Sequence, residues 1–179
     1  IPRWPFDKFA RGDRSIGTQM KATGEVMAID RSFEAAFQKA VRSLEINSQT
    51  ISWEDPEWTA NGDSIDNFPL YPTDVRLWAI MAALRRDIDP NDIARASGID
   101  PWFLYRLQNI VNMESRIKVE NISPDLLSGA KKMGFSDQQI GTIAGIESQD
   151  VRKMRKEWGI RPVYKMVDTC AAEFEATTP

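Results

Sequence analysis

Apolar residues recur at helical spacing in the first quarter of the chain. They fall at i, i+3, i+4, i+7, i+8 and i+11 in the series Phe33, Ala36, Phe37, Ala40, Val41 and Leu44. This spacing predicts an amphipathic helix, with Ser32 as its N-cap. The preceding string GEVMAI, residues 24–29, is short and apolar and follows turn-prone residues, so it predicts a strand. One strand and one helix cannot bury each other adequately, which is typical of the end of a larger domain.

From residue 73 onward the pattern predicts a mainly helical protein. A capping side chain precedes a proline at Asp89-Pro90, Asp100-Pro101 and Ser123-Pro124, where a missing backbone N–H costs nothing. Glycines that can end a helix follow at Gly98, Gly134, Gly145 and Gly159. Together these signals predict six helices near residues 74–86, 90–97, 101–116, 124–133, 137–144 and 148–158.

Two pairs of these helices repeat each other without a gap at an offset of 47 residues. The matched pairs include Ile88 with Phe135, Ile93 with Ile140, Gly98 with Gly145, Ile99 with Ile146, Leu104 with Val151 and Leu107 with Met154. Each copy has the spacing of a hydrophobic staple, and Ser136 with Gln139 adds a capping box. Packing positions therefore repeat, whereas the outward residues do not: Trp102, Phe103 and Tyr105 correspond to Gln149, Asp150 and Arg152.

Residues 47–72 show no sustained periodicity. This stretch holds three prolines and five acidic residues but no basic residue, which favours a surface loop or linker. Its aromatic residues could pack onto neighbouring elements, namely Trp53, Trp58, Phe68 and Tyr71.

Composition excludes several classes of chemistry. The 179 residues are 42% hydrophobic, enough for one domain with flanking pieces. Without histidine there can be no Ser-His or Cys-His pair, and the single Cys170 allows no internal disulfide. No apolar run approaches the roughly 20 residues of a membrane span, and the N-terminus lacks a secretion signal, so we expect a cytoplasmic protein without a membrane partner.

Charge is distributed unevenly about the net value of −3. Residues 47–72 are purely acidic in their charges, whereas residues 131–165 hold eight basic against four acidic residues. The basic residues Arg152, Lys153, Arg155 and Lys156 lie on the second helix of a helix-turn-helix pattern, which would suit DNA. Asp150 and Glu157 interrupt that face, so a helix-turn-helix nucleic-acid binder is the less favoured alternative. A second alternative is an enzyme with a new carboxylate site, although no glycine-rich phosphate loop is present.

Two helices carry more apolar residues than one buried face requires. The helix near 74–86 is apolar on more than one side, so it is either central in the bundle, which we favour, or in contact with another subunit. The helix from Pro101 has core spacing at Phe103, Leu104, Leu107, Ile110 and Val111. Its other aromatic residues, Trp102 and Tyr105, point elsewhere. The candidate interface residues are therefore Leu77, Trp78, Met81, Leu84, Trp102 and Tyr105.

Several strings are specific enough to suggest a family. IPRWPFDKF, QMKATGEVMAIDRSFEAAFQKAVRSLE, GIDPWFL, MGFSDQQIG and RPVYKMVDTCAAEF occur in this order. They resemble the middle of the large subunit of carbamoyl-phosphate synthase across essentially the whole chain, most weakly in residues 47–72. Asp30 is a departure, because the family usually has glycine there.

The resemblance implies a division of the chain. Residues 1–47 would be the tail of the carboxyphosphate-synthetic ATP-grasp domain, 48–160 a helical oligomerisation domain, and 161–179 the linker into the carbamoyl-phosphate-synthetic half. The parent enzyme makes carbamoyl phosphate from bicarbonate, ammonia released from glutamine and two ATP, for pyrimidine and arginine biosynthesis. Both ATP sites, with their Mg or Mn ions, would lie outside this segment, which we expect to be non-catalytic and without a cofactor. Its implied partners are the two ATP-grasp halves, further copies in a homo-oligomer and the glutaminase small subunit.

Overall fold

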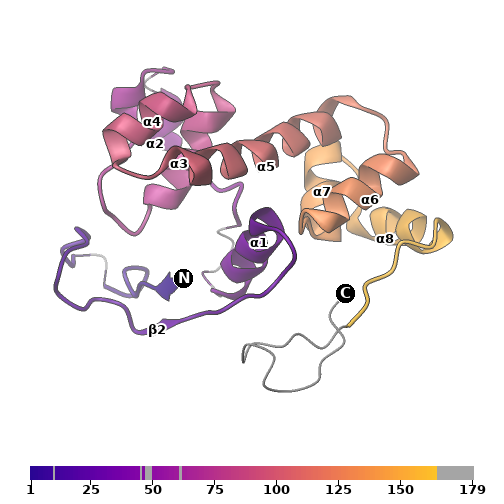
Figure 1. Cartoon of the computed structure of the whole chain (residues 1–179), viewed down its shortest axis with the longest axis horizontal. Coiled ribbons are helices and arrows are strands. Elements are labelled where there is room, and N and C mark those ends of the chain that lie inside the picture. Colours follow the sequence, from indigo (N-terminus) through magenta and orange to yellow (C-terminus); the bar gives the residue numbers. More distant parts are fainter. Residues whose placement is uncertain (10, 45, 47–49, 61, 165–179) are drawn as a thin grey trace.

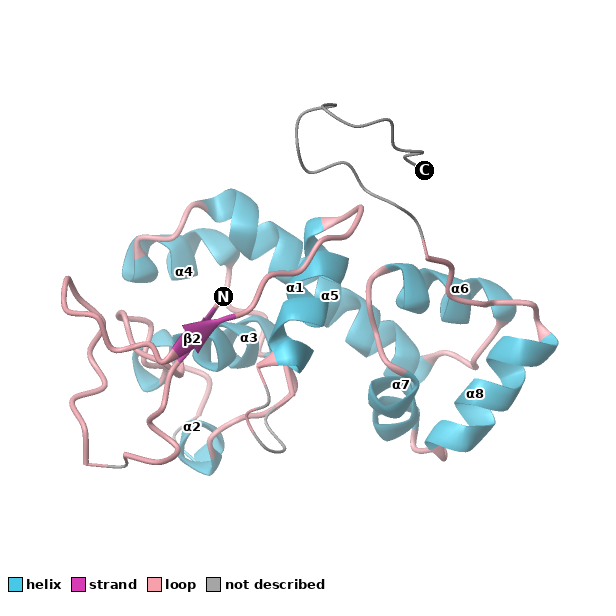
Figure 2. Cartoon of the chain, turned by 90° about the horizontal axis from the view of Figure 1, so that it is seen from below, coloured by secondary structure: helices cyan, strands magenta, loops and turns pink. Residues whose placement is uncertain are grey.

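The computed structural model describes residues 1–9, 11–44, 46, 50–60 and 62–164. The chain is mainly helical, with a two-stranded sheet near the N-terminus (Figures 1 and 2). The elements are β1 (Pro2–Arg3), β2 (Gly24–Glu25), α1 (Phe33–Ser43), α2 (Pro56–Ala60), the 3₁₀ helix η1 (Ile65–Asn67), α3 (Arg76–Arg85), α4 (Pro90–Ser97), α5 (Pro101–Val119), α6 (Pro124–Lys132), α7 (Asp137–Ala144) and α8 (Ser148–Glu157).

The predicted helix starts are confirmed by their capping hydrogen bonds. The side chains of Asp89, Asp100 and Ser123 each accept a hydrogen bond from a backbone N–H in the first turn of α4, α5 and α6. Ser32 caps α1 in the same way. All six predicted helices are present, and the largest boundary difference is in α5, which extends three residues further, to Val119. Local capping chemistry therefore determines most of this secondary structure.

The 47-residue repeat is confirmed as a repeated helical corner. The corner glycines Gly98 and Gly145 both have φ of 70°. Ile93 and Ile140 are both fully buried, and Ser136 forms the predicted capping box with Gln139. The α4–α5 and α7–α8 corners thus share one packing arrangement, and they lie at opposite ends of α5 (Figure 1).

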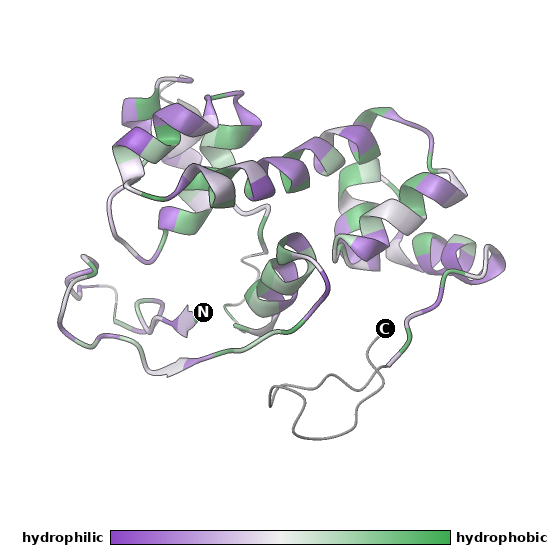
Figure 3. Cartoon of the chain, in the orientation of Figure 1, coloured by the Kyte–Doolittle hydropathy of each residue, from purple (hydrophilic) through white to green (hydrophobic). Residues whose placement is uncertain are grey.

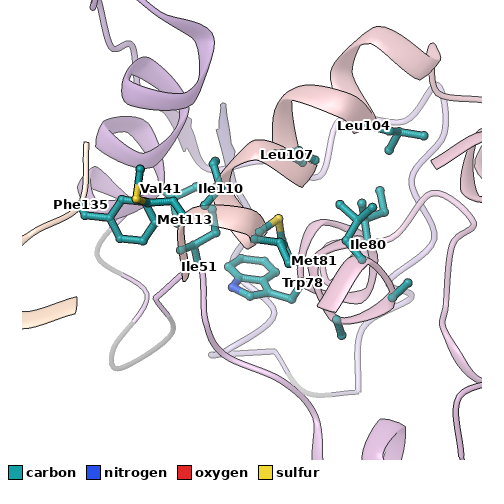
Figure 4. Close-up of a cluster of buried hydrophobic side chains, with 14 of the residues drawn as sticks. Val41, Ile51, Trp78, Ile80, Met81, Leu104, Leu107, Ile110, Met113 and Phe135 are labelled. Atoms are coloured by element: carbon teal, nitrogen blue, oxygen red, sulfur yellow. The ribbon is translucent and has the colours of Figure 1, made fainter. Parts of the chain in front are cut away.

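α3 is the central helix, the first of the two alternatives that its sequence allowed. Every residue from Trp78 to Leu84 is buried, because α3 is covered by α4, α5 and the segment around Ile51. Figure 4 shows Ile80 and Met81 in one buried cluster with Leu104 and Leu107 of α5. Figure 3 shows green and purple residues alternating along α5, as expected of a helix with one buried face.

The strand predicted over residues 24–29 is wrong for most of its length. Only Gly24–Glu25 forms a strand, paired antiparallel with Pro2–Arg3. Met27 is 85% exposed and Ile29 41% exposed, so the apolar side chains after β2 have little cover within the described chain. Asp30, where the family usually has glycine, does not have a positive φ, so its backbone does not require glycine.

The expectation of a surface loop over residues 47–72 is partly wrong, whereas the expectation that its aromatic residues pack onto neighbouring elements is confirmed for Trp53, Trp58 and Phe68. The stretch contains α2 and η1, and it buries Ile51, Trp58, Phe68 and Leu70. Ion pairs explain part of the acidic composition, because Glu54 bonds Arg85 at 3.1 Å and Arg86 at 2.8 Å, and Asp63 lies 3.6 Å from Arg86. Of the aromatic residues, Tyr71 stays 62% exposed.

Candidate association surfaces

Four of the six candidate interface residues lie on α3, and three of them belong to the core. Trp78 is 6% exposed, and Met81 and Leu84 are fully buried. The Trp78 indole N–H donates to the Thr50 carbonyl at 2.8 Å, which ties α3 to the segment before α2. Leu77 is partly buried against the same core. A partner cannot reach Trp78, Met81 or Leu84 while this fold is intact, so we assign those three to the core.

The other two candidates lie on the accessible side of α5. Trp102 is 49% exposed and Tyr105 is 48% exposed. The Trp102 ring packs edge-on against Phe33 of α1 with ring centroids 5.6 Å apart, and the Arg106 guanidinium lies 4.9 Å from its centroid. The Tyr105 hydroxyl accepts a hydrogen bond from the Asn91 amide at 2.9 Å. Both aromatic side chains are therefore held in place and still offer apolar surface, as residues at interfaces commonly do.

Phe103 was expected in the core, and the structure contradicts this. It is 44% exposed and lies beside Phe33, with centroids 5.6 Å apart. The core face of α5 is carried by Leu104 and Leu107, and Phe103 points away from it toward α1. We call Phe33, Phe37, Trp102 and Phe103 the aromatic cluster. Sequence reasoning missed it because it joins two segments that are distant in the chain.

Buried polar contacts attach α1 to α5 and to the α6–α7 turn. Glu34 accepts a hydrogen bond from Asn109 of α5 at 2.8 Å. Gln38 is 1% exposed; its amide donates to the Met133 carbonyl at 2.8 Å, and its oxygen accepts from Gln139 at 3.2 Å. Buried polar groups with satisfied hydrogen bonds fix one relative orientation of the elements that they join. α1 is therefore fixed to α5 and to the α6–α7 turn.

The basic helix α8 uses part of its charge internally. Arg155 bonds Asp137 of α7 at 3.0 Å and Lys131 of α6 bonds the same carboxylate at 2.8 Å. Burial raises the pKa of Asp137, but the hydrogen bonds from Lys131 and Arg155 outweigh it, so the pKa lies below its usual value of 3.8.

Arg155 thus stabilises the packing of α8 on α7 and is withdrawn from any DNA-binding face. Arg152, Lys153 and Lys156 remain exposed, next to the exposed carboxylates of Asp150 and Glu157. The arrangement does not favour a phosphate-binding surface.

Within the described ranges, no group of three or more acidic or cysteine side chains is placed to hold a metal ion. No helix in the described part of the chain is long and apolar enough to cross a membrane.

Comparison with known proteins assigns the family. The profile described as "Carbamoyl-phosphate synthetase large chain, oligomerisation domain" matches residues 25–159. The chain is 52% identical over 179 residues to the carbamoyl phosphate synthase large chain of Thermomicrobium roseum and 56% identical over 178 residues to that of Thermoanaerobacter sp.. It is 49% identical over 185 residues to that of Methanothrix thermoacetophila. These alignments cover 99–100% of this chain but 16% of each relative. The chain belongs to the carbamoyl-phosphate synthase large-chain family, as its oligomerisation-domain segment.

Proposed function

We propose that this chain is the scaffold between the two ATP-grasp halves of a carbamoyl-phosphate synthase large chain. In this proposal residues 1–47 end the first half, 48–160 form the oligomerisation domain and 161–179 lead into the second half. The whole enzyme would make carbamoyl phosphate from bicarbonate, ammonia and two ATP, with ammonia supplied from glutamine by a small subunit. ATP and its metal ions would bind the rest of the large chain. Similarity over the full length of this segment to large chains supports the assignment.

The attachment of α1 is the observation that best supports a scaffold role. α1 belongs to the proposed catalytic tail, yet Gln38 and Glu34 bond the helical domain through buried side chains. A Cβ added to Gly134 would lie 3.0 Å from the Cα of Ala35, so the backbone of α1 touches the α6–α7 turn directly. A joint with backbone contact and buried hydrogen bonds is rigid. The helical domain would therefore hold the first catalytic half in a fixed orientation.

The exposed aromatics of α5 are the proposed self-association surface. Trp102 and Tyr105 present apolar area near the start of α5, and large aromatics at interfaces often carry a dominant share of binding energy. Light scattering should show concentration-dependent dimers or larger species for the 179-residue chain. Replacing Trp102 and Tyr105 together by serine should weaken association at least tenfold, which corresponds to about 1.4 kcal/mol.

A matched control separates loss of contact from loss of fold. Tyr71 is 62% exposed and lies outside the proposed surface, so Tyr71→Ser removes a comparable exposed aromatic. It should leave association unchanged. Unfolding in urea should give similar midpoints for all of these proteins. A wild-type chain that stays monomeric at several hundred micromolar would contradict the proposed self-association.

A further inference from the structure

The two ends of the molecule carry opposite charge. Residues 50–100, which contain α2, η1, α3 and α4, hold ten acidic and four basic residues, whereas residues 101–164 hold seven acidic and ten basic residues. Figures 1 and 2 show α2, α3 and α4 at one end of α5, and α6, α7 and α8 at the other. The chain is therefore an electrical dipole along α5, although its net charge is only −3.

The basic end contains a groove of about 1600 Å³ between the start of α1, the second half of α5, α6 and residues 159–163. Arg31, Lys132 and Arg161 line it, are exposed and form no ion pair within the described chain; Asp30 and Glu34 also line it but are paired with Lys39 and Arg106. Met113, Met133, Ile160 and Val163 add apolar lining. A cationic rim around apolar walls suits an acidic protein surface better than a nucleic acid, which requires a continuous row of phosphate contacts. We call this feature the basic groove.

The acidic end contains a smaller hollow of about 720 Å³ between η1 and the α3–α4 turn. Asp87, Asp89 and Asp92 line it together with Ile65, Ile88 and Arg95, whose guanidinium is ion-paired with Asp92; Asp66 is the residue that follows Ile65 in η1. Asp66, Asp87 and Asp89 are exposed and form no ion pair with any described residue. We call this feature the acidic hollow. Its acidic rim and apolar floor complement the basic groove in both charge and character.

We infer that two copies of this chain associate reciprocally, with the basic groove of each copy facing the acidic hollow of the other. A two-fold arrangement lets both contacts form at once, because each copy carries both surfaces. This inference rests on the proposed self-association; beside the contact of Trp102 and Tyr105 it adds two charged surfaces whose complementarity would direct the association. Complementary charges of this kind set the orientation and accelerate the encounter of the partners.

Charge reversal tests the inference on the 179-residue chain. Arg31→Glu with Arg161→Glu replaces two of the three unpaired cations of the groove by carboxylates, and both positions lie outside helices. Asp66→Lys with Asp92→Lys makes the hollow basic. Each double variant alone should weaken self-association by roughly tenfold or more, since like charges then face each other. Mixing the two variants should restore association, because every contact between unlike variants is again complementary.

The control variant changes the net charge by the same amount as the groove variant, but at positions outside the groove. Arg152→Glu with Lys153→Glu alters two exposed cations of α8 that do not line the groove. This variant should associate within about twofold of the wild-type chain when both are measured at the same salt concentration. Wild-type association should weaken between 50 and 500 mM NaCl, because salt shortens the range of charge interactions to a few ångström. Unfolding midpoints should confirm that all variants are folded.

The outcomes separate the two proposals. A monomeric wild-type chain would contradict both of them. A wild-type chain that associates, but whose association is insensitive to salt and to both double variants, would overturn the reciprocal contact and leave self-association standing. The reciprocal contact would also be overturned, with self-association left standing, if the mixture of the two variants fails to associate while each variant is folded.

Discussion

The tight α7–α8 corner predicts that adding one methyl group will destabilise the protein. A Cβ on Gly141 would lie 2.7 Å from the Ile146 carbonyl oxygen and 3.2 Å from the Ser148 amide nitrogen. Both are backbone atoms, so relief requires the corner to open. In the other copy the corresponding residue is Ala94, which shows that a corner of this type can be built with a methyl group there. Gly141→Ala should therefore fold, at a cost in stability.

The size of the cost follows from two opposing effects. Alanine in place of glycine inside a helix stabilises by about 0.5–1 kcal/mol, because the unfolded chain loses freedom. Overpacking against a rigid backbone costs about 1–3 kcal/mol. The net expectation is a loss of up to about 2.5 kcal/mol in the free energy of unfolding.

Gly129 in α6 is the matched control. The nearest atom to its added Cβ is the terminal carbon of the flexible Met113 side chain at 3.6 Å, which is ordinary contact. Gly129→Ala should therefore stabilise the protein by about 0.5–1 kcal/mol. Urea unfolding followed by circular dichroism should separate the two variants by roughly 1 M in midpoint. If Gly141→Ala were as stable as Gly129→Ala, the close approach of α7 and α8 would not be real.

Two further substitutions test the polar joints. Gln38→Ala should lower the unfolding free energy by about 1–3 kcal/mol, because the buried Met133 carbonyl and Gln139 amide lose their partner; the exposed neighbour variant Lys39→Ala should stay within about 0.5 kcal/mol. Asp137→Asn should cost about 1–3 kcal/mol at pH 7, since Lys131 and Arg155 lose their shared carboxylate. The folded pKa of Asp137 is depressed, so its contribution is complete above the unfolded pKa of 3.8 and is lost as pH falls through the folded value. The stability difference between wild type and Asp137→Asn should therefore shrink in unfolding measurements below about pH 4, and a difference that stays constant as the pH is lowered further would contradict this account.

Helix starts and ends were predictable because their causes are local. Asp89, Asp100 and Ser123 cap the residues that immediately follow them, and this chemistry is visible in four or five letters of sequence. The repeated corner was visible for a similar reason: its glycines and buried residues recur in a fixed order. Burial of α3 was one of two readings of an apolar helix, and only the structure distinguishes them.

The failures all involve contacts between distant segments. The acidic residues of 50–72 predicted a loop, because nothing in the local sequence indicates that Glu54 bonds Arg85 and Arg86, about thirty positions later. Phe103 was predicted to lie in the core because of its spacing along the helix. Its partner Phe33 lies on another helix, and this contact leaves the Phe103 ring partly exposed. Apolar content predicted a strand as far as residue 29. A strand also needs a partner, and β1 pairs only with Gly24 and Glu25.

The duplicated corners show how one packing arrangement can carry unlike outward residues. Their interior residues are constrained by packing, so Ile93 and Ile140 are identical and equally buried. Their outward residues are free to differ: Asp92 corresponds to Gln139, and Tyr105 corresponds to Arg152. α5 holds the two corners apart by its 19 residues, about 28 Å at the usual helical rise. In a reciprocal pair the first contact then brings the second into register, so the second forms as an intramolecular step. Modest surface charges that would contribute little as isolated pairs can direct association when a rigid helix presents both at once.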